Sequence, residues 1–243
     1  MSIDTSDIKN IPQHVALIVD GNRRWAKRRS LPTLEGHRRG VDNVEKIFDL
    51  GRSMGIKYMT AWVFSTDNWN RDPAEVKYLF ELFREHIKKY RKKFMKEEIR
   101  FIHLGRKDRV DEDIRELIEA LEEDTKDFTN QTICLALDYG GRVDLIRATK
   151  KIVENGEEIT EENIDKNLDT ADVPNPDLII RTSGELRMSG FLSWQSSYSE
   201  FAFPETPFPA FKEELFVEAI RNYSERDRRF GGNSKNEKKY LKK

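Results

Sequence analysis

The residues best suited to chemistry follow directly on the apolar run Val15–Val19. They are Asp20, Gly21, Asn22, Arg23, Arg24 and Trp25. Backbone N–H groups around a glycine turn attract anions, and arginines form bidentate, charge-assisted hydrogen bonds to phosphate oxygens. Asp20 alone among them is suited to magnesium, which prefers one or two carboxylates together with water and phosphate oxygens. The segment therefore indicates a phosphate site with a metal ligand, although a turn followed by a solvated helix start would also account for it.

Two further polar segments each follow a short apolar run. The segment after Leu178–Ile180 has two arginines and three hydroxyls around a glycine and reads Arg181-Thr182-Ser183-Gly184-Glu185-Leu186-Arg187-Met188-Ser189. This composition predicts a second diphosphate site. The segment after Tyr58–Phe64 reads Ser65-Thr66-Asp67-Asn68-Trp69-Asn70-Arg71. Glu200 is a further candidate magnesium ligand, although a lone glutamate beside a strand is more often a surface residue.

These segments need a scaffold that brings them to one edge. Apolar and β-branched runs predict strands at Val15–Val19, Tyr58–Phe64, Ile99–Leu104, Thr132–Leu137 and Leu178–Arg181. Helical periodicity predicts helices over 37–54, 73–97, 111–128, 143–155 and 210–228. This alternation predicts an α/β fold with an open, mostly parallel central sheet of about six strands flanked by helices. Ligands of such sheets lie beyond the carboxyl ends of the strands, which is where the polar segments follow.

The length and composition limit the organisation of the chain. With 243 residues, 37% of them hydrophobic, it can bury one substantial core but not two catalytic domains. We therefore expect a single domain over residues 1–243, with flexible ends over 1–12 and 232–243 and a polar excursion over 155–170. Cys134 is the single cysteine, which excludes an intramolecular disulfide and favours a reducing cytoplasm.

The charge pattern narrows the classes of partner. The 43 basic and 44 acidic residues nearly cancel, which argues against a nucleic-acid protein with a positive surface field. The first ten residues lack the apolar core of a signal peptide, and no apolar run approaches the roughly 20 residues that span a bilayer, so we expect a soluble protein. The basic run from Lys88 to Lys93 could contact anionic lipid headgroups at the membrane periphery, although such a run is more often a solvated helix face.

An ordered set of motifs resembles the cis-prenyltransferases, the family typified by undecaprenyl diphosphate synthase. The motifs are His14-Val15-Ala16 before Asp20-Gly21-Asn22, Gly36-His37, Phe64-Ser65-Thr66-Asp67-Asn68-Trp69, Tyr139-Gly140-Gly141-Arg142, Arg181-Thr182-Ser183-Gly184-Glu185, and Trp194-Gln195 with Tyr198 and Glu200. They span nearly the whole chain. The resemblance implies a hydrophobic product tunnel, a homodimer, and Mg²⁺-dependent elongation of an allylic prenyl diphosphate by isopentenyl diphosphate.

The resemblance also implies roles for individual residues. Asp20, Asn22 and His37 would be catalytic, and Asp20 and Glu200 would bind the metal, with Glu200 supplied by either subunit. Substrates would be bound by Gly21, Arg23, Arg24, Trp25, Ser65, Asp67, Asn68, Trp69, Arg71, Arg181, Arg187, Ser189, Arg229 and Gly231. Arg181, Arg187 and Ser189 would hold the isopentenyl diphosphate. Arg229-Phe230-Gly231 matches an Arg-x-Gly element that would reach the same diphosphate across the dimer.

Several positions depart from the bacterial pattern of this family. Asp67 replaces a glutamate, Asp138 replaces an asparagine, and Thr33 stands where many members have an arginine. Val63 and Leu137 stand where long-chain members tend to have alanine, so their bulk would favour a shorter product if they face the tunnel. The apolar stripe after Pro73 predicts a tunnel wall, although such a stripe is usually core.

Four rival functions are weighed against elongation. Trans-prenyltransferases bind magnesium through Asp-Asp-x-x-Asp, but the sequence has no Asp-Asp pair. An irregular enzyme of the same fold, which couples two dimethylallyl units, remains open, although the set around Arg181 favours elongation. A non-catalytic accessory subunit also remains open, although such subunits typically lose the Asp-Gly-Asn motif. A nucleotide-binding regulator is disfavoured, because neither Gly-x-Gly-x-x-Gly nor a P-loop motif is present.

Overall fold

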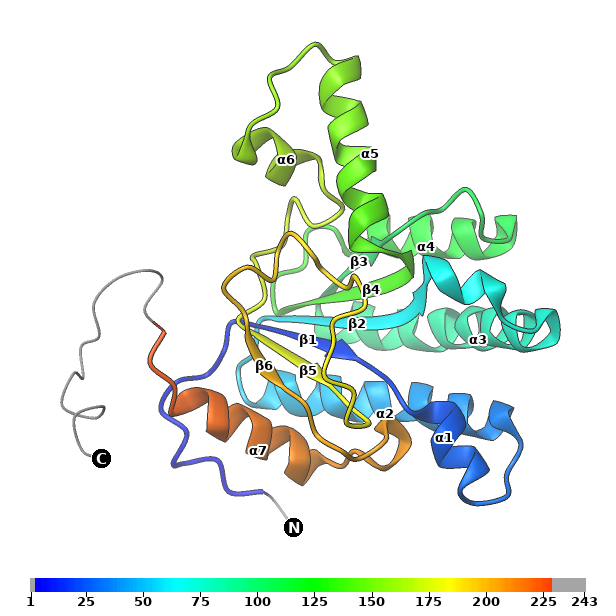
Figure 1. Cartoon of the computed structure of the whole chain (residues 1–243), viewed down its shortest axis with the longest axis vertical. Helices are drawn as coiled ribbons and strands as arrows, with labels where there is room; N and C mark the ends of the chain where they lie inside the picture. The colour runs from blue at the N-terminus through cyan, green and yellow to red at the C-terminus, as the bar shows by residue number, and fades with distance from the viewer. Residues whose placement is uncertain (1–2, 229–243) are drawn as a thin grey trace.

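The computed structural model describes residues 3–228, which form an α/β fold (Figure 1). Along the chain the elements are β1 (His14–Ile18), α1 (Asn22–Lys27), α2 (Thr33–Ser53), β2 (Tyr58–Ser65), the 3-10 helix η1 (Thr66–Asn70), α3 (Pro73–Glu97), β3 (Ile99–Leu104), α4 (Glu112–Thr125), β4 (Gln131–Tyr139), α5 (Gly141–Glu154), α6 (Glu161–Asn167), β5 (Leu178–Arg181), β6 (Glu200–Ala202), the 3-10 helix η2 (Phe208–Ala210) and α7 (Glu213–Ser224). None of the helices in this part of the chain is long and apolar enough to cross a bilayer.

The six strands form one sheet in the order β3-β4-β2-β1-β5-β6, and every neighbouring pair is parallel. The predicted open, parallel α/β sheet is therefore confirmed, and each of the five predicted strands lies within two residues of its expected bounds. β1 lies between β2 and β5, so Val15 is opposite both Met59 and Leu178. The chain runs from β1 to β2 on one side and later crosses to β5 on the other. The carboxyl end of β1 is thus a topological switch point, where such sheets bind ligands.

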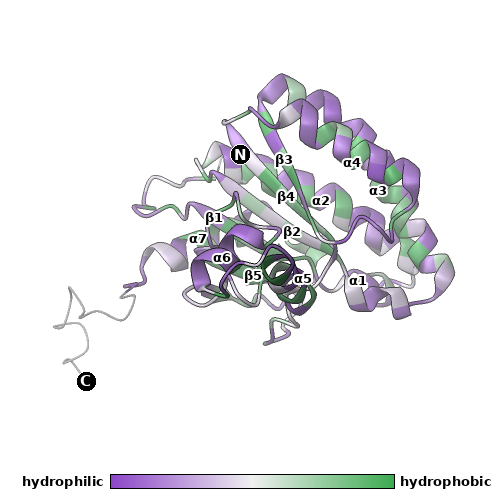
Figure 2. Ribbon diagram, turned by 90° about the horizontal axis from the view of Figure 1, so that it is seen from above, coloured by the Kyte–Doolittle hydropathy of each residue, from purple (hydrophilic) through white to green (hydrophobic). Residues whose placement is uncertain are grey.

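Alternate side chains of each strand enter two apolar layers. Val15 and Leu17 enter the larger layer, to which α2, α3, α4 and α7 contribute. Ala16 and Ile18 enter the smaller layer, which is closed by Phe191 and other residues of irregular segments. Figure 1 shows α2 and α7 on one side of the sheet and α5 and α6 on the other. Figure 2 shows hydrophilic colouring over the outer surface of α3 and α4 and hydrophobic colouring on β3 and β4 beneath them.

The helix α3 has the predicted bounds because its first turn carries a strong cap. The Asp72 side chain accepts hydrogen bonds from the backbone N–H groups of Ala74 and Glu75, and Pro73 occupies the first helical position. Two short helices were not predicted. These are α1, and α6 within the polar excursion over 155–170.

The N-terminal segment packs onto the body of the protein. Ile8 and Ile11 contact the larger apolar layer, and Asp7 forms an ion pair with Arg221 of α7 at 2.6 Å. The predicted flexible segment 232–243 lies outside the described residues.

Candidate active site

Asp20 and Gly21 form a tight turn at the carboxyl end of β1. Gly21 has φ +97°, and a Cβ there would lie 2.6 Å from Ser183 Oγ and 2.9 Å from Pro207 Cβ, so only glycine fits. Asp20 Oδ1 accepts a hydrogen bond from Gly21 N at 2.6 Å, and the Asp20 carbonyl accepts one from Thr182 Oγ1 at 2.8 Å. These bonds fix the Asp20 carboxylate while leaving its side chain 28% exposed.

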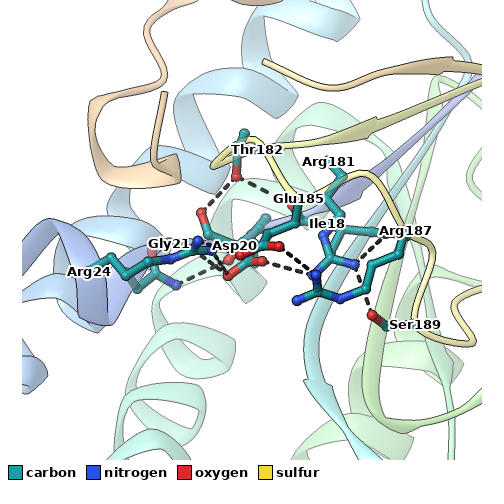
Figure 3. A network of polar contacts seen from close by, with 11 residues as sticks. Ile18, Asp20, Gly21, Arg24, Arg181, Thr182, Glu185, Arg187 and Ser189 are labelled. Carbon is teal, nitrogen blue, oxygen red and sulfur yellow. Dashed lines mark hydrogen bonds and ion pairs between the residues drawn. The ribbon is translucent and has the colours of Figure 1, made fainter. Parts of the chain in front are cut away.

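Arg181 joins the carboxyl ends of β1 and β5 (Figure 3). Its Nη2 donates to Asp20 Oδ2 at 2.9 Å, and its Nη1 donates to Ser189 Oγ at 2.9 Å and to the Arg187 carbonyl at 2.5 Å. The side chain is 6% exposed, and within residues 3–228 its Nε has no hydrogen-bond partner. A buried donor without an acceptor is costly, so the guanidinium is suited to an anionic ligand.

Glu185 holds together the arginines on the two sides of the site. Its Oε1 accepts a hydrogen bond from Arg24 Nη1 at 2.6 Å, and its Oε2 accepts one from Arg187 Nη1 at 2.5 Å (Figure 3). Arg187 and then Arg24 lower the pKa of the Glu185 carboxyl. Arg24 Nη2 also lies 3.2 Å from Asp20 Oδ1. Protein carboxylates therefore occupy donors that a diphosphate could use.

His37 contributes a buried imidazole from the first turns of α2. Its Nε2 lies 3.1 Å from Glu75 Oε1 at the start of α3. Glu75 also contacts Arg71 Nη1 at 3.2 Å and Arg23 Nε at 3.7 Å. Burial lowers the pKa of His37, an effect that Glu75 opposes, and burial also lowers the pKa of Arg71. At neutral pH the imidazole is consequently biased towards its neutral form, which can accept a proton.

A cleft of about 500 Å³ brings most of the predicted site residues together. Those that line it are Asp20, Asn22, Arg23, Arg24, His37, Ser65, Asp67, Asn68, Arg71, Arg181 and Ser189. The η1 loop is fixed by a capping box in which Asn68 Oδ1 accepts the Ser65 backbone N–H at 3.1 Å. Asn22 Nδ2 donates to the Val19 carbonyl at 3.2 Å, and Asn22 Oδ1 is buried without a partner among the described residues.

Neither of the two predicted tryptophans, Trp25 and Trp69, lines the cleft. Trp25 is buried and stacks under the Arg29 guanidinium, 4.6 Å from its ring centroid. Trp69 packs against Phe64 and Phe80, and its Nε1 donates to Asp138 Oδ1 at 2.9 Å. In this chain both tryptophans support the loops that carry the cleft residues.

Glu200 and Asp20 lie at opposite ends of the parallel strands. Glu200 is paired with Leu178, and Leu178 with Val15, so Glu200 is level with the amino end of β1, whereas Asp20 follows its carboxyl end. Its carboxylate accepts a hydrogen bond from Arg226 Nη1 at 2.7 Å. A single chain therefore does not bring the two predicted metal ligands together. The predicted residues Arg229 and Gly231 lie outside the described residues.

The donors in the cleft fit a magnesium ion that arrives with a diphosphate. Among residues 3–228 there is no group of three or more histidine, cysteine, aspartate or glutamate side chains that could form a protein-only cage. Magnesium does not require such a cage, because one carboxylate, water and phosphate oxygens satisfy it. The partly exposed Asp20 carboxylate, beside donors for phosphate, provides this kind of site.

A second, apolar cavity of about 70 Å³ adjoins the cleft. It lies between α2, α3 and the sheet, and its walls include Val44, Phe48, Phe83, Ile87 and Ile133. Val63 lines both the cavity and the cleft, so the two spaces meet at this residue. Leu137, the other candidate for limiting chain length, is fully buried and lines neither space.

Glu75 and Glu185 have no individual role in the predicted site, and Thr182 appears there only as one of three hydroxyls. Glu185 was visible inside a motif, but its bridging position depends on how the loops after β1 and β5 meet. Glu75 occupies the first turn of α3, where the only role expected of an acidic residue is a favourable interaction with the helix dipole. Its contact with His37 across two helices has no signal in the sequence.

Comparisons with known proteins agree with the motifs. Residues 18–231 match a family model described as "Putative undecaprenyl diphosphate synthase". A relative named isoprenyl transferase from Aquifex pyrophilus is 46% identical over 222 residues, covering 91% of this chain and 96% of the relative.

Two solved structures share the fold. Lavandulyl diphosphate synthase from Lavandula x intermedia, solved in complex with dimethylallyl diphosphate, is 35% identical with a TM-score of 0.87, covering 91% of this chain and 98% of that one. A probable undecaprenyl diphosphate synthase from Campylobacter jejuni is 33% identical with a TM-score of 0.79, covering 91% and 99%.

Proposed function

This chain belongs to the undecaprenyl diphosphate synthase family and is a cis-prenyltransferase, and from that premise we propose its substrates, its metal and its assembly. We propose that it joins isopentenyl diphosphate to an allylic prenyl diphosphate with a new cis double bond and releases diphosphate. The observation that carries this proposal is the cleft in which Asp20 is surrounded by donors from α1, β5 and the η1 loop, beside an apolar cavity that shares the lining residue Val63.

The arginines would stabilise the charge that develops as the allylic C–O bond breaks. Negative charge grows on the departing diphosphate, and preorganised donors act most strongly where charge develops. Arg24 lies 3.2 Å from Asp20 and also contacts Glu185, so the departing diphosphate would exchange these carboxylate partners of Arg24 for phosphate oxygens. Magnesium bound at Asp20 would add further positive charge to the same leaving group. Arg181, Arg187 and Ser189 would hold the isopentenyl diphosphate.

Proton removal completes the reaction after the isopentenyl double bond has attacked the allylic carbon. His37 is a candidate for this step, because its burial favours the neutral imidazole and Glu75 fixes one ring nitrogen at 3.1 Å. Asn22 would orient the reacting groups from the other side of the cleft, and the diphosphate itself could also take the proton. The growing chain would enter the apolar cavity past Val63.

We further propose a homodimer in which Glu200 completes the magnesium site of the partner subunit. The support is geometric, because Glu200 and Asp20 lie at opposite ends of the parallel strands in one chain. Mixing tests this directly. Asp20→Ala and Glu200→Ala proteins should each be inactive, and subunit exchange should restore up to about a quarter of wild-type activity, since half the dimers would then hold one intact site of two. A mixture as inactive as its parents would refute shared sites.

The reaction is tested by incubating the protein with magnesium, labelled isopentenyl diphosphate and one primer at a time. The primers are dimethylallyl, geranyl, farnesyl and geranylgeranyl diphosphate, and the dephosphorylated products are separated by chromatography. We expect cis-elongated products that disappear in Asp20→Ala. They should persist in Asp144→Asn, because Asp144 is buried and does not line the cleft. A product from dimethylallyl diphosphate alone would instead indicate irregular coupling. No product under any condition would favour the accessory-subunit alternative.

We place the enzyme in the cytoplasm, with peripheral contact to the membrane as the lipid product leaves. Lys88 and Lys92 are exposed on α3, the helix that walls the apolar cavity. Co-sedimentation with vesicles of anionic and of neutral lipid tests this, since binding should require the anionic lipid and fall as salt rises.

A further inference from the structure

A row of ion pairs and one histidine–aspartate contact joins α2 to α3 along a seam beside the apolar cavity. On α2 it includes Asp42, Glu45, Asp49 and Arg52, and on α3 it includes His86, Lys89, Lys93 and Glu97. We call these eight residues the α2–α3 ladder. Successive members on each helix are three or four positions apart, so each set lies along one helix face.

Lys93 is the central member of the ladder. Its Nζ lies 3.0 Å from Glu45 Oε1 and 2.6 Å from Asp49 Oδ2. Lys89 also contacts Glu45 at 3.4 Å, and His86 approaches Asp42 at 3.7 Å. The Lys93 side chain is 22% exposed, and Lys93 lines the cavity together with Phe48 and Phe94.

The cavity is too small for a prenyl chain in its present form. An engineered apolar cavity of about 150 Å³ in a protein core binds benzene, and this cavity has only about 70 Å³. Its walls must move apart as a chain enters. One wall is the hydrogen-bonded sheet, which resists separation. The opposite wall is the seam between α2 and α3, where partly exposed side-chain ion pairs hold two helices together and can break one at a time.

We propose that the α2–α3 ladder limits how far the cavity opens and thereby sets the length of the prenyl chain. The inference rests on the proposed function and adds a determinant of product length that lies outside the cleft. In this account a growing chain pushes against the seam until further opening would break the contacts of Lys93. Elongation then stops, and the chain is released.

The decisive variant is Lys93→Met, which removes the ammonium group and keeps an apolar side chain against the cavity. Lys93→Arg keeps the charge and serves as the rescue. Arg91→Met is the matched control. Arg91 is also on α3, but it forms an ion pair with Asp124 of α4 and not with α2. Glu45→Gln is a second variant in case Lys93→Met lowers the folded yield, which thermal unfolding would reveal.

Product lengths are compared after reaction with labelled isopentenyl diphosphate and farnesyl diphosphate. We expect Lys93→Met and Glu45→Gln to shift the main product upwards by at least one five-carbon unit, while Lys93→Arg and Arg91→Met match the wild type. High salt should lengthen wild-type products by screening the ladder and should change Lys93→Met little. Unchanged lengths in Lys93→Met with normal incorporation would overturn the proposal, as would an equal shift in Arg91→Met.

Binding of an uncharged apolar dye, N-phenyl-1-naphthylamine, gives a readout that does not depend on catalysis. If the ladder restrains the cavity, Lys93→Met should bind the dye at least about threefold more tightly than the wild type or Arg91→Met does, because its seam opens more easily. Equal affinity in all three proteins would contradict it. If the wild type extends no primer, the proposed function fails, and the dye measurement still decides whether the ladder restrains the cavity.

Discussion

The cleft and the apolar cavity share Val63 and differ in almost every other respect. The cleft measures about 500 Å³ and places four arginines, two aspartates and a histidine around one space. The cavity measures about 70 Å³ and is walled mostly by aliphatic and aromatic side chains, with Glu45, Asp49 and Lys93 as its charged lining residues. Among the described residues, Asn22 Oδ1 and Arg181 Nε in the cleft have no hydrogen-bond partner. The cavity, by contrast, has little free space. The cleft has room for a ligand that exchanges carboxylate–arginine contacts for its own, whereas the cavity must widen to accept one.

The difference shows how a single chain can treat the two ends of one substrate separately. The charged groups of the cleft would act on the diphosphate, where bonds change. The cavity would act on the hydrocarbon, where only size matters. Substitutions in the cleft should therefore change rates, and substitutions in the cavity should change product length.

The largest effect is expected for Asp20→Asn. This change keeps the size of the side chain and removes the negative charge, so kcat/KM should fall by roughly 10² to 10³-fold or more. Steady-state kinetics with saturating magnesium would measure the loss. Activity within threefold of the wild type would show that the cleft does not depend on this carboxylate.

A smaller loss is expected for Arg181→Lys. Lysine keeps the charge but replaces the planar guanidinium, whose Nη2 reaches Asp20 and whose Nη1 reaches Ser189, with a single ammonium nitrogen. Losing one or two charge-assisted hydrogen bonds should lower kcat/KM by about 10 to 100-fold, mainly through KM for isopentenyl diphosphate. An unchanged KM for that substrate would remove Arg181 from its binding site.

Val63→Ala and Leu137→Ala sharpen the boundary between the two regions. Val63 lines both spaces, so Val63→Ala should lengthen the product while rates stay within a few-fold of the wild type. Leu137 is packed in the core, so Leu137→Ala should lower the free energy of unfolding by about 2 to 5 kcal/mol and leave product length unchanged. Chromatography of the products and urea unfolding would separate these outcomes, and lengthening in Leu137→Ala alone would reverse the assignment.

The smallest catalytic effect is expected for Asp144→Asn, because this buried carboxylate lines neither region. Burial, and then the charge of Asp169, raise the pKa of Asp144 from 3.8 to about 6. The folded state thus holds its proton more tightly than the unfolded state, and stability falls as pH rises from about 4 to about 6. Asp144→Asn should be more stable than the wild type by roughly 1 to 3 kcal/mol near pH 7.5 and about equal to it near pH 4.

Urea unfolding at several pH values, with kinetics measured in parallel, tests this prediction. A variant that is less stable than the wild type near pH 7.5 would show that the carboxylate is needed as an anion. A large loss of activity in a stably folded Asp144→Asn variant would show that Asp144 contributes to the active site.

Local signals in the sequence predict much of the fold. Ile99–Leu104 and Pro73–Glu97 appear with the expected bounds, because a short apolar run and a capped amphipathic stripe each specify their own element. β6 spans only three residues and α1 only six, and elements this short carry no periodic pattern. Their formation depends on neighbours distant in the chain.

The candidate site was predicted best where it is built from residues adjacent in sequence. Asp20 follows β1 and Arg181 ends β5, two strands that the sequence predicts, and the parallel register brings their side chains within 2.9 Å. The contact of Glu75 with His37 depends instead on the packing of α3 against α2. The separation of Glu200 from Asp20 depends on strand register, which no single motif encodes.

The most direct test of one substrate spanning both regions is photo-crosslinking with a benzophenone analogue of farnesyl diphosphate, followed by peptide mapping. We predict labelling of α2 over residues 41–48 and of α3 over residues 83–94, which wall the cavity. Unlabelled farnesyl diphosphate should compete, and Asp20→Asn should reduce the labelling in the presence of magnesium. Labelling that is confined to the surface groove around Arg100, Glu122 and Asp172, or that is indifferent to Asp20, would contradict the account.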